Sequence, residues 1–275
     1  MTALPAAAET LAPVIEAGAF FDCEVLEVRH YTDTLFSFRT ARPQSFRFRT
    51  GEFVMIGLAG EGKPTLRAYS LAGPSWDDAL EFYSIKVEDG ALTSRLKHIR
   101  PGDRVLVGRK PTGTLVLDAL LPGKRLFLLS TGTGVAPFAS IVREPDVYAR
   151  YDQVILTHTC RTAAELAYSH ELVAGLKDDP LVGEIAPEKL VYFSSVTRED
   201  GPQTGRITDL IQSGLFFKSI QQARFDPEQD RVMICGSLAM LEELKTIFEE
   251  LGFTEGSNAR PGSFVVEKAF SGDGI

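Results

Sequence analysis

The chain has 275 residues, of which 44% are hydrophobic and 24% are charged, and its formal net charge is -8. This balance is typical of a folded chain of about two domains, and it excludes a largely disordered protein and a general nucleic-acid binder, which needs clustered cations. No apolar run approaches the roughly 20 residues of a membrane span, and the start lacks the basic segment of a secretory signal, so a cytoplasmic protein is expected.

The first half is rich in short β-type segments separated by Gly, Pro and Asp turns. They cover residues 22–31, 34–41, 52–59, 67–72, 79–87, 103–108 and 114–119. Many short strands with little helix predict a small antiparallel β-barrel over residues 19–120, preceded by a flexible tail over residues 1–18. One helical insert breaks the pattern at 90–103, where Thr93 or Ser94 is expected to cap a short helix that ends at Pro101-Gly102.

After the Pro122-Gly123 turn, strand-like and helix-like segments alternate. Strands are predicted over 124–130, 152–160, 189–197, 231–237 and 263–270, and helices over 137–145, 164–179, 206–216 and 238–252. This alternation is typical of a doubly wound, parallel α/β domain, which we expect over residues 121–275.

The three cysteines, Cys23, Cys160 and Cys235, are far apart in the sequence. Neither a metal or iron-sulfur ligand spacing nor a disulfide framework is recognisable, so no metal centre is expected. Any redox chemistry therefore needs an organic cofactor.

The first strand of the second domain runs into STGTGVAPF, residues 130–138. Small residues let backbone N–H groups approach a pyrophosphate, and Pro137 can begin a helix whose N-terminus favours an anion. The pattern departs from G-x-G-x-x-G, because Pro137 takes the place of the third glycine. Thr133, Gly134 and Val135 are candidate dinucleotide contacts, and the alternative is a turn that only packs.

Cations follow two of the later strands. Arg161 comes after the second strand of this domain, Thr197-Arg198 ends the third, and Arg206 follows eight residues further on. Ligands of open α/β sheets bind beyond the carboxyl ends of the strands, and guanidinium groups suit a phosphate better than a ribose diol. These residues favour NADP over NAD, although a single arginine at such a place is commonly only a surface residue.

The fourth strand of the domain ends in a thiol, a glycine and a hydroxyl, which are Cys235, Gly236 and Ser237. A buried cysteine is commonly an inert small hydrophobe. At a strand end beside a glycine, however, it is small enough to orient a nicotinamide ring without blocking it.

Within the first half, RAYS places a cation, an aromatic ring and a hydroxyl on one extended segment. Arg67 can pair with a pyrophosphate, Tyr69 can stack on a flat ring, and Ser70 can hydrogen-bond a ring nitrogen. A phosphorylated tricyclic ring of this kind is a flavin. The segment 83–87 can line its edge with backbone polar groups, and the helix start at 90–94 can donate N–H groups to the FAD phosphates.

Taken together, RAYS, YSIKV, GALTS, TGTGVAPF, THTCR, SSVTRE with GRIT, and ICGS resemble the ferredoxin-NADP reductase family of the bacterial type, from about residue 20 to the end. The resemblance implies an FAD-binding barrel and an NADP-binding α/β domain with the flavin between them. The resemblance also implies which residues contact the flavin: Arg67, Ala68, Tyr69, Ser70, Tyr83, Ser84, Ile85, Lys86, Val87, Leu92, Thr93 and Ser94. It places Thr133 between flavin and nicotinamide, and it places Arg161, Thr197, Arg198 and Arg206 at the 2'-phosphate.

The C-terminus departs from the plant-type pattern, in which a terminal tyrosine stacks on the flavin. Here Glu267 is followed by Lys268, Ala269 and then the tail from Phe270 to Ile275. Alanine cannot stack, so displacement of the tail is expected to admit the nicotinamide. Ala269, Phe270, Ser271 and Gly272 are expected to contact FAD, and the alternative is a frayed end.

The expected reaction is hydride transfer between NADP(H) and flavin N5, followed by single-electron exchange with ferredoxin or flavodoxin. Ser70, Cys235 and Glu267 are the expected catalytic residues, although Glu267 could equally be a structural acid. An acidic carrier is expected to dock on a basic face that includes Lys86, Arg95, Lys97 and Arg100, and a monomer is expected. The alternatives are a free-flavin reductase and a non-catalytic flavin-binding electron-transfer subunit.

Overall fold

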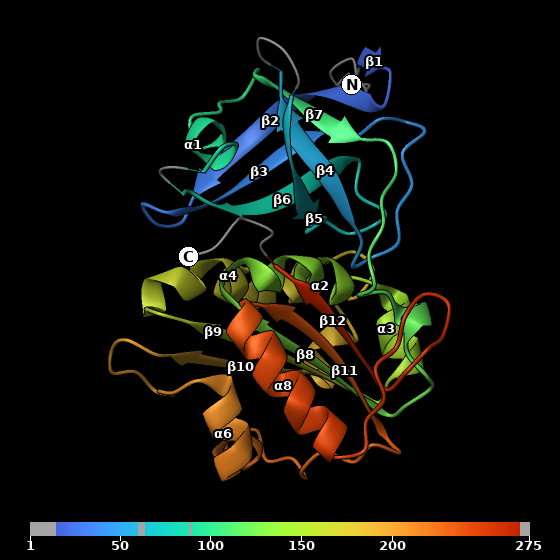
Figure 1. Ribbon diagram of the computed structural model, residues 1–275, viewed down its shortest axis with the longest axis vertical. Coiled ribbons are helices and arrows are strands. Elements are labelled where there is room, and N and C mark those ends of the chain that lie inside the picture. The colour runs from blue at the N-terminus through green and yellow to red at the C-terminus, as the bar shows by residue number, and fades with distance from the viewer. Residues whose placement is uncertain (1–14, 60–63, 88–89, 270–275) are drawn as a thin grey trace, which may run out of the picture.

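The computed structural model describes residues 15–59, 64–87 and 90–269, and it divides into an antiparallel and a parallel part (Figure 1). In the described chain the antiparallel sheet has the strand order β5-β4-β7-β2-β3-β6, with β1 paired to β2. Its strands are β1 Ile15–Ala17, β2 Phe20–His30, β3 Leu35–Ala41, β4 Phe53–Leu58, β5 Thr65–Ser70, β6 Ala79–Ile85 and β7 Arg104–Gly108. This curled sheet is the β-barrel domain expected from the sequence.

Alternation along the strands builds the interior of this domain. In β2, Phe21, Cys23 and Val25 are buried, while the residues between them are half-buried. The inward residues meet an aromatic layer in which Phe38 of β3 stacks on Phe82 of β6 with ring centroids 5.1 Å apart. A period of two residues therefore places one face of each strand in the core.

The second sheet is parallel and has the order β10-β9-β8-β11-β12. Its strands are β8 Arg125–Thr131, β9 Gln153–Cys160, β10 Leu190–Val196, β11 Asp230–Gly236 and β12 Phe264–Lys268. The helices of the described chain are α1 Thr93–Leu96, α2 Ala136–Ile141, α3 Pro145–Arg150, α4 Ala167–Gly175, α5 Ala186–Lys189, α6 Ile207–Ser213, α7 Leu215–Ser219 and α8 Leu238–Glu250. Short 3-10 turns are η1 Leu117–Ala119, η2 Gly132–Val135, η3 Ala163–Leu166 and η4 Leu176–Asp178.

Helices cover both faces of the parallel sheet, as a doubly wound fold requires. In β8, Leu126 and Leu128 belong to the same buried cluster as Phe138 of α2, whereas Phe127 and Leu129 belong to the cluster of α6 and α8. Because β8 is buried on both faces, it reads as a continuous apolar run. The α/β fold class expected from the sequence is confirmed.

Helices α2 and α4 lie on the side of the parallel sheet that faces the antiparallel domain (Figure 1). One buried cluster continues across this boundary, from Leu35, Ala72 and Tyr83 of the first domain to Phe138 and Tyr168 of the second. The two domains therefore share a packed interface. In the described part of the chain, no helix has the length and apolar character to cross a membrane.

Several local expectations are wrong. Residues 114–119 form no strand and end in η1. The helix expected over 137–145 ends at Ile141, and a separate helix, α3, begins at Pro145. Leu92 precedes α1 without a side-chain cap, because the Thr93 hydroxyl instead donates to the Val87 carbonyl at 3.1 Å. Within the flexible tail expected over residues 1–18, residues 15–17 form strand β1, which pairs with β2. Residues 1–14 lie outside the described residues.

The chain passes from one sheet to the other after η1. Leu120 and Leu121 lie between η1 and β8, at the place where the sequence predicts the second domain to begin. The division into 19–120 and 121–275 stays a prediction.

Candidate functional site

Strand β5 carries the RAYS segment along the border of the antiparallel sheet. The Tyr69 side chain is 9% exposed, its hydroxyl lies 3.0 Å from the Ser84 hydroxyl, and burial raises its pKa. Its ring is held edge-on by Phe38 and Phe82, each with centroids 6.4 Å away. Tyr69 thus belongs to the buried cluster of the antiparallel domain, and its stacking on a flavin ring stays a prediction.

The other RAYS residues are half-buried. Among the residues that the structure describes, the Arg67 guanidinium donates to the adjacent Leu66 carbonyl at 2.9 Å, and its other donors have no partner there. Successive residues of a strand point to opposite faces, so Ser70 turns away from the face that Arg67 and Tyr69 share. The assignment of all three residues to the flavin stays a prediction.

Strand β6 contributes from both of its faces. Ser84 meets Tyr69, whereas the Tyr83 ring points to the second domain and stacks on Tyr168, with centroids 4.2 Å apart and an interplanar angle of 14°. Ile85 and Lys86 are half-buried at the strand end, and the Lys86 ammonium lies 5.9 Å from the Phe36 ring centroid. Tyr83 can therefore offer a ligand little beyond its backbone.

The turn before α1 is closely built. A Cβ at Gly90 would lie 2.1 Å from the Thr93 hydroxyl, so only glycine fits while that hydroxyl bonds Val87. Leu92 and Thr93 are buried and Ser94 is half-buried. The turn brings the predicted flavin residues 87 and 92–94 together.

In the second domain, η2 packs directly on the end of β11. A Cβ at Gly134 would lie 2.1 Å from the Cys235 carbonyl oxygen, and one at Gly236 would lie 2.2 Å from the Thr131 hydroxyl. The Ser237 N–H donates to that same hydroxyl at 3.0 Å, and the Ser237 hydroxyl caps α8. The structure thus brings together the two predicted nucleotide segments, residues 133–135 and 235–237, and only glycine permits the approach.

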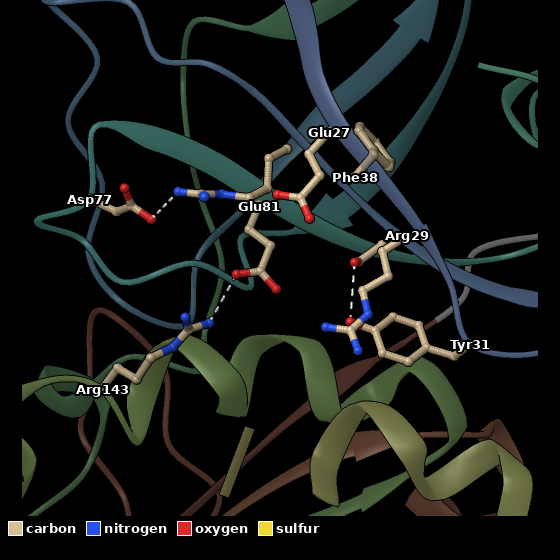
Figure 2. Close-up of a pocket in the computed structure, with 9 residues that line it drawn as sticks. Glu27, Arg29, Tyr31, Phe38, Asp77, Glu81 and Arg143 are labelled. Atoms are coloured by element: carbon tan, nitrogen blue, oxygen red, sulfur yellow. Dashed lines mark hydrogen bonds and ion pairs between the residues drawn. The ribbon is translucent and has the colours of Figure 1, made fainter. Parts of the chain in front are cut away.

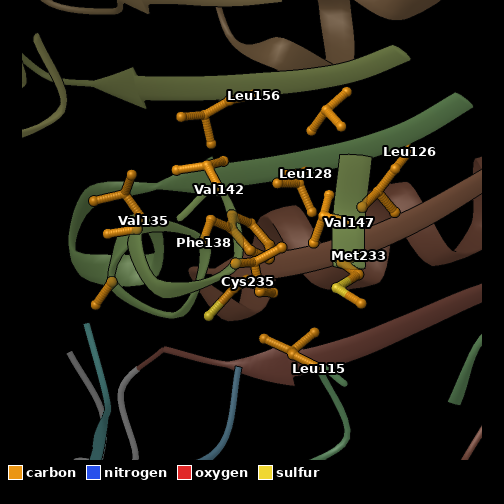
Figure 3. Close-up of a cluster of buried hydrophobic side chains, with 14 of the residues drawn as sticks. Leu115, Leu126, Leu128, Val135, Phe138, Val142, Val147, Leu156, Met233 and Cys235 are labelled. Carbon is orange, nitrogen blue, oxygen red and sulfur yellow. The ribbon is translucent and has the colours of Figure 1, made fainter. Parts of the chain in front are cut away.

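The Cys235 thiol is fully buried among Leu128, Val135, Phe138 and Met233 (Figure 3). Burial raises its pKa well above the ordinary value, so the thiol stays protonated. The expected access of this side chain to a ligand is not seen in the described structure. Its role in placing a nicotinamide stays a prediction.

Glu267 lies opposite Cys235 in the β11–β12 pairing. Its Oε2 accepts from the Thr114 N–H at 3.1 Å, and burial raises its pKa to about 7. Just after β12, the Ala269 N–H donates to the Gly236 carbonyl at 3.2 Å. The predicted contacts of Phe270, Ser271 and Gly272 lie outside the described residues.

The strand ends of β9 and β10 hold two of the three arginines side by side. The Arg198 N–H donates to the Arg161 carbonyl at 2.9 Å, and the Thr197 N–H donates to the Cys160 carbonyl at 3.0 Å. Arg161, Thr197 and Arg198 are exposed. The Arg206 guanidinium is also exposed, but it forms an ion pair with Glu243 at 3.1 Å.

A buried polar chain behind η2 was missed by the sequence reasoning. The His158 Nε2 lies 2.8 Å from the Gly132 carbonyl, and its Nδ1 lies 2.7 Å from the Ser169 hydroxyl, which in turn meets the Tyr192 hydroxyl at 2.7 Å. Burial lowers the pKa of His158 to about 4, so the ring is neutral and its Nε2–H can donate to Gly132. The one signal in the sequence was a histidine that follows an apolar run within a predicted strand.

The residues of the predicted basic face differ in exposure, and the face itself stays a prediction. Arg95 and Arg100 are exposed and Lys97 is half-buried, and Arg95 donates to the Ala59 carbonyl at 2.9 Å. The nearby Arg104 of β7 pairs with Asp22 at 3.1 Å. Among the residues that the structure describes, no group of three or more His, Cys, Asp or Glu side chains is arranged to hold a metal ion.

Comparisons with known proteins agree with this arrangement. Residues 25–116 match the family described as Oxidoreductase FAD-binding domain, and residues 128–246 match the Oxidoreductase NAD-binding domain. The chain is 56% identical over 265 residues to the flavodoxin/ferredoxin-NADP reductase of Rhodobacter capsulatus, covering 96% of this chain and 98% of the relative. It is 50% identical over 247 residues to the ferredoxin-NADP reductase of Pseudomonas aeruginosa, covering 90% and 96%.

A solved structure is also similar. The ferredoxin NADP+ reductase from Neisseria gonorrhoeae, solved with bound FAD and NADP, superimposes with a TM-score of 0.84 at 28% identity. The match covers 92% of this chain and all of the other.

Proposed function

Because the chain belongs to the ferredoxin-NADP reductase family, we propose that it is an FAD-dependent oxidoreductase that exchanges electrons between NADP(H) and ferredoxin or flavodoxin. The geometric observation that carries this function is the close approach of Gly134 to Cys235 and Gly236. This approach creates a turn of small residues at the carboxyl edge of the parallel sheet. The turn faces the antiparallel domain, which matches an FAD-binding family.

The residues of the antiparallel domain fit FAD. Tyr69 is held in place by Ser84, the Arg67 guanidinium has donors without a partner among the described residues, and a side chain at Gly90 would displace the Thr93 hydroxyl from Val87. These residues, with Ala68, Ser70 and the segments 83–87 and 92–94, would hold the cofactor. When bound, FAD supplies the chemistry that links a two-electron hydride exchange at N5 to single-electron exchange with a carrier.

The second domain would hold NADP(H). Arg161, Thr197 and Arg198 lie together at adjacent strand ends, where exposed guanidinium groups can bind a phosphate dianion. Arg206 would have to leave Glu243 to join them. His158 would not contact the nucleotide itself, but its hydrogen bond to the Gly132 carbonyl would support the turn that does.

The function is tested by mixing the FAD-loaded protein with NADPH or NADH without oxygen, and then adding oxidised ferredoxin. NADPH should bleach the flavin absorbance and ferredoxin should restore it. Arg198→Ala should raise the KM for NADPH by about tenfold or more, because a charge-assisted contact is lost, and leave the KM for NADH unchanged. The exposed Arg260 provides the control, Arg260→Ala, which should change neither.

Two outcomes would contradict the proposal. If NADPH does not bleach the flavin, the proposed reductase activity is excluded. Equal changes in KM for both nucleotides in Arg198→Ala would remove the assignment of this arginine to the 2'-phosphate.

The carrier protein would dock on the basic face formed by Lys86, Arg95, Lys97 and Arg100. The positive charges of this face contrast with the net charge of -8, which supports an oriented encounter with an acidic partner. The monomeric state and the cytoplasmic location belong to the same proposal and rest on the sequence.

A further inference from the structure

Glu81 of β6 joins the two domains through both of its carboxylate oxygens. Oε2 accepts from Arg143 Nη2 at 3.2 Å, and Oε1 accepts from the Tyr168 hydroxyl at 2.9 Å. Arg143 follows α2 and Tyr168 lies in α4, so one side chain of the antiparallel domain contacts two elements of the parallel domain. The side chains of Glu81 and Arg143 are only 15% and 18% exposed, so water screens this ion pair weakly.

Arg143 Nη2 also donates to a backbone carbonyl of the antiparallel domain. It donates to the Ala72 carbonyl at 2.6 Å, while Arg143 Nε donates to the Ala139 carbonyl at 2.9 Å. The planar guanidinium group is thus fixed at one end in α2 and at the other end in the segment that follows β5.

Tyr168 connects this contact to the predicted flavin residues. Its ring stacks on Tyr83, which lies two residues after Glu81 and therefore on the same face of β6, and both rings meet Tyr31 edge-on. Tyr168 is 4% exposed, and burial together with the adjacent Glu81 raises its pKa well above the ordinary value. Its hydroxyl consequently remains a hydrogen-bond donor at any working pH.

Close to this contact lies a pocket that belongs mostly to the antiparallel domain and is bordered by Arg143 of the second domain. A cavity of about 230 Å³ is lined by polar side chains that include Arg39, Asp77, Glu81 and Arg143 (Figure 2). Side-chain packing cannot fix the domain angle where atoms do not meet. Beside the cavity the domains are joined by the polar contacts of Glu81 and by the Ser75 hydroxyl, which donates to Glu144 at 3.0 Å.

We propose that Glu81, acting through Arg143 and Tyr168, is a positioning residue that sets the orientation of the two domains and hence the approach of nicotinamide to flavin. The inference rests on the proposed function for its kinetic consequence. A displacement of about 1 Å between reacting groups can slow a reaction by up to about a hundredfold, so a small change in domain angle is sufficient.

The test compares two conservative variants with a matched control in the FAD-loaded, full-length protein. Glu81→Gln removes the charge that binds Arg143, and Tyr168→Phe removes the hydroxyl while keeping the stacked ring. The control is Glu171→Gln, which breaks the ion pair between Arg29 of β2 and Glu171 of α4. That pair also joins the two domains, but its side chains are 54% and 45% exposed, so little effect is expected.

One readout needs no catalysis. Trp76 is the only tryptophan of the chain, it is 39% exposed, and its indole N–H lies 3.4 Å from the Arg143 carbonyl. Acrylamide quenching of its fluorescence should increase in Glu81→Gln and in Tyr168→Phe and stay unchanged in the control. The second readout is the rate of flavin reduction at saturating NADPH, which should fall by about tenfold in both variants with the Kd for NADPH unchanged.

Quenching and reduction rates equal to those of the parent protein would overturn the proposal, and so would equal effects in Glu171→Gln. A lower rate that comes only from lost FAD or weaker NADPH binding would also overturn it. If NADPH fails to reduce the parent protein, the proposed function fails, whereas the Trp76 measurement still decides whether Glu81 holds the domains.

Discussion

Glu267 shows how burial changes the chemistry of a single carboxyl group. Its pKa is raised from 4.5 to about 7, with desolvation as the main cause and the Thr114 contact acting in the opposite direction. The folded state therefore holds this proton more tightly than the unfolded chain. The stability that the protonated group contributes is complete below about pH 4.5 and is lost as the pH rises to about 7.

Glu267→Gln should remove this part of the pH dependence, because an amide does not ionise. Relative to the parent, the variant should gain free energy of unfolding between pH 5 and pH 8, roughly the interval over which Glu267 titrates. Urea unfolding of the FAD-loaded proteins at both values measures the difference. If the difference in free energy of unfolding between variant and parent is the same at pH 5 and at pH 8, roughly the ends of the expected interval, Glu267 does not titrate between these pH values.

At the scale of elements, η2 depends on contacts that only glycine permits. In Gly134→Ala the added Cβ would meet the Cys235 carbonyl, a backbone atom that cannot rotate away. We expect the free energy of unfolding to fall by about 1–3 kcal/mol and the KM for NADPH to rise. Chemical denaturation and steady-state kinetics measure the two effects.

Gly175→Ala is the matched control for that substitution. Gly175 ends α4, and a Cβ there would meet nothing within 4 Å. Its replacement should leave NADPH binding unchanged and should not lower stability, because alanine favours a helix. Similar losses in both variants would mean that η2 tolerates a side chain at Gly134.

At the scale of the whole molecule, the uneven charge predicts how the carrier protein binds. The chain is acidic overall, whereas Arg95, Lys97 and Arg100 lie close together on the antiparallel domain. Raising the ionic strength from about 0.05 M to about 0.5 M shortens the screening length, so the KM for ferredoxin should rise. Steady-state assays measure this, with a small uncharged electron acceptor as the control. A KM for ferredoxin that is independent of salt would exclude an electrostatic docking face.

The sequence by itself determined the two fold classes and the segments that meet at the site. Period-two alternation in β2 and the continuous apolar run of β8 are local patterns, because each residue's burial follows from strand geometry. The Gly134 turn and the Cys235-Gly236 strand end were also recognisable, since both carry unusual residue types at the ends of strands. The strand expected over 114–119 was wrong because apolar residues alone do not distinguish a strand from an extended connection that ends in a 3-10 turn.

Only the tertiary structure decided which distant residues act on one another. Glu81 and Tyr168 are 87 positions apart, and His158 meets Gly132 and Ser169 through three different elements. Strand alternation states which face a side chain occupies, but it does not state which element of another domain covers that face. The burial of Cys235 and the Arg206–Glu243 pair follow from how elements of the second domain pack on one another, and the Tyr83–Tyr168 stack follows from how the two domains pack.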